Sequence, residues 1–442
     1  MSFASLASRS GRSPPDRSGA PGAARHGASF RPFFLAGALQ AVAVIGLWGA
    51  AFPLVARLDP PLGPAAWHAH ELLFGYVPAV QAGFLLTAVP HWTGRRPLAT
   101  APLAALVVLW IVGRLAVAGF LGLGPFAVAA VATAFTVALA AVVTHEIVAA
   151  RSVATAAAVV SLAVLVVAQI LFHAAAASGH DGAFASRLAL AGVTAQMMLL
   201  GGRIVPAFTR DYLVETGRAP MPDSVRRLDT AAAGLGLFAL VVWLGSPWLD
   251  DAAPAAGVVL LVAAVLLVVR QARWAPLKTL DEPLVWSLHL GAAMTPLGFF
   301  IAGAGALLGD GALAAAVIHV WAIGGIGLMT LALMTRVSLG HTGRPPRALR
   351  GSTAIVLAIA LAAAARAGSG LVPAWTLPLL PLAGGLWIAA YVGFLVVYGP
   401  LLVRPGVTPE RSGAAPAGVQ APPAAALTRH PDSRRSSSRS RP

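Results

Sequence analysis

Histidines inside apolar segments are the residues of this chain that could do chemistry. In the run WHAHELLFGYVPAVQAGFLLTAVPHWTGRRP (67–97), His68, His70 and Glu71 open a long apolar stretch, and His173 and His319 lie in two others. Such side chains are costly in a membrane unless they face the bundle interior, a cavity or a partner. Imidazole is also the commonest ligand of haem iron, copper and zinc. The cluster favours a His-ligated centre over ordinary hydrogen bonds between helices.

The composition indicates a polytopic membrane protein. The 442 residues are 58% hydrophobic and 11% charged, with a mean hydropathy of +0.79, whereas a soluble protein is about 25% charged. The net charge of +15 comes from arginine, because Lys278 is the only lysine. It predicts membrane topology and basic tails, not nucleic-acid binding. The chain has no cysteine, so a metal needs His, Met or carboxylate ligands and a haem is bound non-covalently.

Twelve apolar segments are long enough to cross a bilayer. They are 33–55, 67–90, 97–117, 125–148, 152–178, 185–208, 228–249, 253–272, 283–308, 311–337, 351–371 and 373–402. With a cytoplasmic amino terminus, nearly all loop arginines fall on the inside. The sequence predicts an all-α polytopic membrane helix bundle with both termini cytoplasmic. A membrane domain over 31–403 is flanked by disordered cytoplasmic tails, 1–30 and 404–442.

This topology sorts the histidines by depth. His68, His70, His173 and His319 fall in the outer half, whereas His289 and His341 fall toward the inner face. Glu71 follows His68 by three residues and could orient it, and Gln169 could do the same for His173. Arg203 lies deep enough to meet a haem propionate or another anion, although anchoring at the inner face also explains it.

Two of the predicted spans resemble each other. His70 aligns with His319, Gly75 with Gly324, and a Thr-Gly-Arg turn follows each histidine after the same interval, at 93–95 and 342–344. Twenty-three residues of helix are about one membrane crossing. An internal duplication and chance similarity both explain this echo.

Five motifs resemble the NnrS family of integral membrane proteins. They are FRPFFLAGALQA (30–41), HAHELLFGYVPAVQAGFLLTAVPHWTGRRPL (68–98), GGRIVPAFTRD (201–211), LHLG (288–291) and HVWAIGGIGLMTLALMTRVSLGHTGRPP (319–346). His91, Ala207 and Asp211 depart from the family pattern, which puts in doubt any role of those side chains.

The resemblance implies haem b and copper, and a role in the nitric-oxide response or denitrification. The family's histidines correspond to His68, His70, His289, His319 and His341, with His173 added from LFHAAA (171–176). From depth, we expect His70 and His319 to face each other across one haem, with Arg203 near its propionates. We expect His68 and His173 to serve a nearby copper or a second haem.

Two functions remain open at this stage. The first is a haem- and copper-binding protein of nitric-oxide metabolism or nitrosative stress in a bacterial inner membrane, with nitric oxide and an electron donor as partners. The alternative is a transporter of a metal or small solute with a histidine-lined path. Intramembrane carboxylates are scarce, so whether the protein is an enzyme is left open.

Overall fold

A computed structural model describes residues 29–50, 62–150, 156–222, 224–248 and 250–404. These residues form helices and no strand, and twelve of the helical spans are long and apolar enough to cross a membrane. The predicted all-α class and the number of spans are therefore confirmed. The predicted tails lie almost wholly outside the described residues.

Along the chain, the twelve spans form three consecutive groups of four. The first group is α1 (Phe30–Ala50), the segment α3–η3–α4 (Pro64–His70, Glu71–Tyr76, Val77–Thr93), α5 (Thr100–Val117) and α6 (Pro125–Ala149). The second is α7 (Ala156–Ala177), α8 (Ala183–Glu215), α9 (Arg226–Gly245) and α10 (Ala253–Ala272). The third is α11 (Pro283–Leu308), the segment α12–η8–α13 (Gly311–His319, Val320–Gly327, Leu328–Gly340), α14 (Ser352–Leu371) and α15 (Thr376–Val397), followed by the short α16 (Gly399–Val403).

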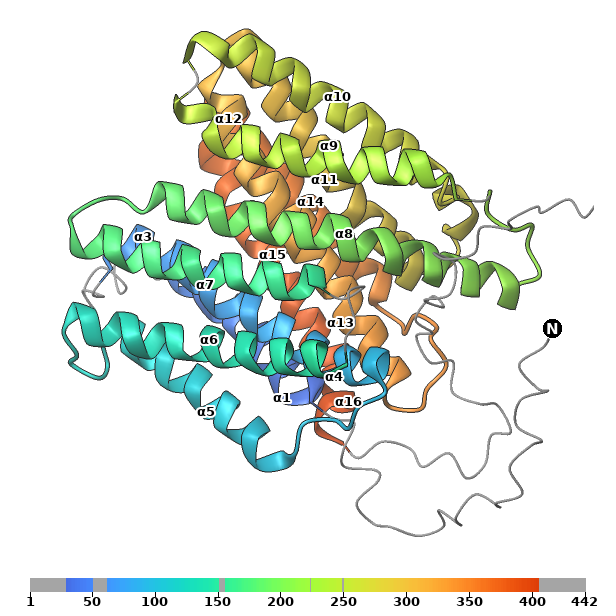
Figure 1. Ribbon diagram of the computed structural model, residues 1–442, viewed down its shortest axis with the longest axis horizontal. Coiled ribbons are helices and arrows are strands. Elements are labelled where there is room, and N and C mark those ends of the chain that lie inside the picture. The colour runs from blue at the N-terminus through green and yellow to red at the C-terminus, as the bar shows by residue number, and fades with distance from the viewer. Residues whose placement is uncertain (1–28, 51–61, 151–155, 223, 249, 405–442) are drawn as a thin grey trace, which may run out of the picture.

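The three groups close into a ring. The first helix of each group packs against the last span of the group before it: α7 against α6, α11 against α10, and α1 against α15. Figure 1 shows α6, α7 and α8 side by side where the first and second groups meet. The contact between α1 and α15 brings the first group against the third, so each group packs against both of the others.

The second span of each group is the longest and the most buried. These spans cover Pro64–Thr93, Ala183–Glu215 and Gly311–Gly340, with 30, 33 and 30 residues. They touch one another through contacts of α4 with α13 and of α8 with both η3 and η8. They therefore form the centre of the bundle, and the remaining spans surround them.

All three central spans end in the same turn. Thr-Gly-Arg follows at 93–95, 216–218 and 342–344, and each glycine adopts a left-handed φ of 64–74°. Each threonine hydroxyl donates to the carbonyl four residues before it, at 2.7–2.8 Å. A left-handed glycine is the usual helix terminator. We call this end of the bundle the arginine end, and the end where α3 begins and α7 ends the histidine end.

The echo between the first and third groups extends beyond the aligned motifs. A π-helix begins immediately after each matched histidine, at Glu71 after His70 and at Val320 after His319. The offset in sequence that relates His70 to His319 also relates Arg114 to Ala363. A Cβ on Gly75 would lie 2.6 Å from Arg114, and one on Gly324 would lie 3.4 Å from Ala363. The two groups thus repeat their packing as well as their sequence.

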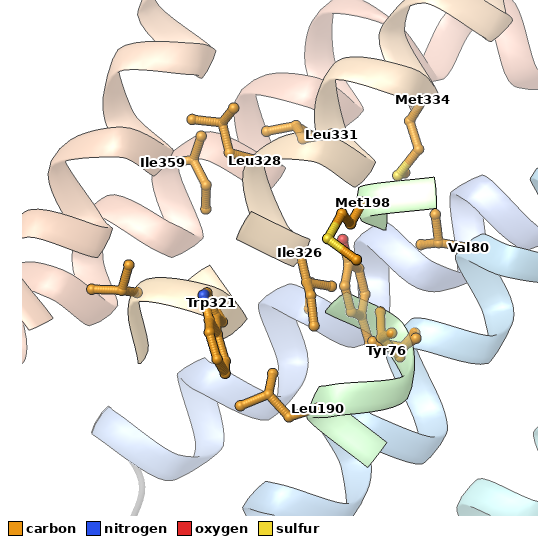
Figure 2. Packing of buried hydrophobic residues seen from close by; sticks show 14 of the residues in the cluster. Tyr76, Val80, Leu190, Met198, Trp321, Ile326, Leu328, Leu331, Met334 and Ile359 are labelled. Carbon is orange, nitrogen blue, oxygen red and sulfur yellow. The ribbon is translucent and has the colours of Figure 1, made fainter. Parts of the chain in front are cut away.

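The core brings side chains of all three groups together around η8. Figure 2 shows Tyr76 and Val80 of the first group, Leu190 and Met198 of the second, and a larger set from the third. The Tyr76 hydroxyl, at the end of η3, lies 2.5 Å from that of Tyr391 and 2.6 Å from that of Thr330. These polar contacts link the first π-helix to the third group.

Candidate metal centre

The π-helix η3 places a carboxylate in the protein interior. A π-helix is a local widening that is frequent at functional sites, and here it holds Glu71 only 2% exposed. Gly75, four residues on, has no side chain, so the guanidinium of Arg114 lies directly against the helix. The indole of Trp110 donates to the Gly75 carbonyl at 2.9 Å. Helix α5 is thus held against η3 at the level of Glu71.

Glu71 is held by donors from three helices. Gln40 Nε2 donates to Oε2 at 2.5 Å, and Arg114 Nη1 donates to Oε1 at 2.6 Å. His70 Nδ1 lies 3.1 Å from the same Oε1. An ionised carboxylate only accepts hydrogen bonds. The proton of a neutral His70 ring is therefore held on Nδ1, and its lone pair lies on Nε2.

That lone pair points at another histidine. His70 Nε2 and His173 Nε2 lie 3.1 Å apart, and the two rings meet edge to face with centroids 4.8 Å apart. Phe74 and Phe172 surround the His70 ring. A tetrahedral ion with two metal–nitrogen bonds of about 2.0 Å holds its nitrogens about 3.3 Å apart. The distance fits two ligands of one metal ion, and it also fits one hydrogen bond between the rings.

A second histidine pair lies nearby at the histidine end. His68, His319 and Arg366, which lies on α14, are close enough together for their charges to interact. The Nδ1 atoms of both rings are buried without a hydrogen bond of good geometry, although the Ala315 carbonyl interacts weakly with His319. Trp48 stacks on His68 with ring centroids 4.8 Å apart. The first and third groups meet here.

The other predicted ligands lie toward the arginine end. His289 Nε2 is 2.8 Å from the Thr209 hydroxyl, and the His341 ring packs beside Phe30 at the start of α1. Arg203 is exposed on α8, about 30 Å along the helix from its start at the histidine end. The structure does not bring these three residues to either histidine pair.

The structure shows a different partner for His70 from the one expected from depth. Both His70 nitrogens are engaged, by Glu71 and His173, so His70 does not face His319. Residues two apart on a helix point about 200° apart, which directs His68 away from this pair. Glu71 orients His70 instead of His68. Gln169 bonds Thr136 and the Ala132 carbonyl, not His173.

The sequence did not predict three further side chains of these sites: Gln40 and Arg114, which donate to Glu71, and Arg366, which lies near His68 and His319. Arg114 and Arg366 are intramembrane arginines, and that alone marks a functional candidate; Gln40 gave no signal. Within the described part of the chain, no group of three or more His, Asp or Glu residues could hold a metal ion. The centre that the residues define is thus a pair of imidazoles with a carboxylate behind one of them.

The fold and site define a multi-pass helical membrane protein with a buried pair of histidines, His70 and His173, between its first two groups of spans. A family model described as NnrS protein matches residues 26–405. The chain therefore belongs to the NnrS family, as its motifs predicted. No curated protein matches the chain.

Proposed function

We propose that this protein binds copper between His70 and His173 inside the membrane and acts on nitric oxide. One observation carries the copper site: two Nε2 atoms lie 3.1 Å apart, and Glu71 holds the proton of one ring on the far nitrogen. A carboxylate behind a ligating imidazole fixes its tautomer and raises its basicity. Imidazole suits copper among the transition metals.

The residues around this pair prepare a ligand site. Glu71 and Arg114 neutralise each other at 2.6 Å, so the two rings sit beside a balanced charge pair inside an apolar shell. Phe74 and Phe172 pack against the His70 ring, and an apolar shell of this kind limits the access of water to a metal site. Copper held here would supply a redox-active centre that binds a small diatomic ligand.

The second pair has the donor types that a b-type haem uses. His68 and His319 are imidazoles for the iron, and Arg366 is a cation for a propionate. The buried Nδ1 atom of His68 has no hydrogen-bond partner among the described residues, and this observation favours a ligand on that ring. The proposal thus moves the haem from His70–His319 to His68–His319, and exchanges Arg203 for Arg366.

The setting proposed for this chemistry is a bacterial inner membrane. The three Thr-Gly-Arg turns share one end of the bundle, and positive charge marks the cytoplasmic side. Both histidine pairs then lie toward the outer face. The role in nitric-oxide metabolism or nitrosative stress, and the need for an electron donor, rest on the resemblance to the family.

The test is metal analysis with a reduced-minus-oxidised spectrum of detergent-purified full-length protein. Wild type should contain copper and show the spectrum of haem b, and nitric oxide should change that spectrum. His173→Ala should lose copper and keep the haem. Folded wild type with neither cofactor, after growth with both supplied, would overturn the proposal and favour the transporter.

A further inference from the structure

We propose that Arg114 binds a planar anion with two oxygens, of the carboxylate or nitrite type, beside the His70–His173 pair. The two edges of its guanidinium have different surroundings. Nη1 donates to Glu71 Oε1. Nη1 and Cδ both face Gly75, 2.6 and 3.4 Å from where its Cβ would lie. The edge of the guanidinium that carries Nη1 therefore packs against η3.

The opposite edge carries Nε and Nη2. Both atoms are buried and meet no hydrogen-bond partner among the described residues, and Arg114 as a whole is only 8% exposed. A buried donor without a partner is costly, and few occur in native proteins. These two donors thus call for an acceptor that the described chain does not provide.

The pair of atoms identifies the shape of that acceptor. Nε–H and one Nη2–H point the same way and form a fork, which matches two oxygens of one planar anion. A single carbonyl or water oxygen reaches both donors only through two bent hydrogen bonds that share one acceptor atom. A planar group with two equivalent oxygens satisfies both in one plane.

The charges around the fork favour an anion once metal is bound. Arg114 and Glu71 cancel each other, and the electrostatic influence of Arg114 reaches both His70 and His173. A cation between the two rings would leave net positive charge in a site of low dielectric, which an anion on the fork would offset. The positive charge of the metal ion belongs to the proposed function, and the inference rests on it to that extent. The two unpaired donors of Arg114 do not depend on the metal ion.

Two sources could supply the same chemistry. One is a free anion, for which nitrite and formate are suitable probes. The other is a carboxylate group of a bound haem. Both place two oxygens on Nε and Nη2, so the experiment must separate them.

The experiment titrates nitrite and formate into full-length protein in detergent, by calorimetry at constant chloride concentration. Copper and haem contents are measured on the same samples. Arg114→Lys keeps the charge and removes the fork. Gly75→Ala forces the guanidinium away from η3. Gly324→Ala is the matched control, because it crowds Met294 at the equivalent π-helix position.

For a free anion, wild type and Gly324→Ala bind a probe, and both site variants bind it at least tenfold more weakly. For a haem carboxylate, wild type binds neither probe, and the two site variants alone lose haem. Equal probe binding by wild type and Arg114→Lys overturns the inference, as does a wild type without probe binding whose haem content Arg114→Lys leaves unchanged. Probe binding at Arg114 in a protein that holds no copper would refute the proposed copper site and leave this inference standing.

Discussion

His70 Nε2 and His173 Nε2 lie 3.1 Å apart although the residues are 103 positions apart in the chain. His70 belongs to the first group of four spans and His173 to the second, so the contact forms only when these two groups pack together. His68 of the first group and His319 of the third likewise lie near each other although they are far apart in the chain. Both candidate sites are therefore products of the assembly of the groups, and no single group contains either one.

Replacing His173 with alanine is the most direct test of the copper site. Removing one of two ligands should lower the copper content of the purified protein by more than about tenfold, because even the loss of a residue behind a ligand costs 10–100-fold in affinity. Elemental mass spectrometry gives the content per chain. His180→Ala, an exposed histidine between α7 and α8, is the control. Unchanged copper in His173→Ala would exclude His173 as a ligand.

Replacing Glu71 with glutamine tests its role behind His70 and its role as the counter-ion of Arg114. The amide can no longer hold the His70 proton in the same way, so the affinity for copper should fall by about 10–100-fold. The change also leaves Arg114 as an uncompensated buried charge, which costs about 3–5 kcal/mol of stability. Competition with a copper chelator measures the affinity, and denaturant unfolding in detergent measures the stability.

The double variant Glu71→Gln/Arg114→Gln separates these effects. It removes the uncompensated charge, so it should regain part of the stability that Glu71→Gln loses. The affinity for copper should stay low, since the carboxylate behind His70 is still missing. A double variant that is less stable than Glu71→Gln alone would refute the ion-pair explanation.

The number of spans and the end that holds most histidines were predictable, because both depend on local composition. The apolar segments fix the spans, and the arginine turns fix their alternation. The partners of His70 were not predictable. Its alignment with His319 indicated a shared depth, but depth does not determine the direction of a side chain. The widening of the helix at η3 and the position of α7 decide that direction, and both arise from packing between distant segments.

Arg114 shows a second limit. It interrupts an apolar run, and an intramembrane arginine is a functional candidate in its own right. Its partner could not be read from the sequence, because Glu71 is 43 residues away and Gly75, which admits the guanidinium, has no visible link to it. The repeat offers no help either, since Ala363 stands at the equivalent position.

Tyr76 should stabilise the contact between the first π-helix and the third group. Tyr76→Phe removes hydroxyl contacts of 2.5 Å to Tyr391 and 2.6 Å to Thr330. Leaving these buried groups with fewer partners should cost about 1–3 kcal/mol, measured by denaturant unfolding in detergent. Tyr212→Phe, at a partly exposed tyrosine near the arginine end, should change stability by less than about 0.5 kcal/mol. Equal effects of the two variants would show that the buried contact contributes nothing specific.

His319 and His289 provide the comparison that tests where the haem lies. Both are intramembrane histidines of the third group, but His319 faces the His68 and Arg366 side at the histidine end, whereas His289 bonds Thr209 toward the arginine end. His319→Ala should abolish the haem b spectrum of the purified protein. His289→Ala should keep the spectrum and lose only about 1–3 kcal/mol of stability. It removes one hydrogen bond of Thr209, whose hydroxyl still donates to the Val205 carbonyl. The reverse result, with haem lost only in His289→Ala, would move the haem to the other end of the bundle and separate it from the His70–His173 pair.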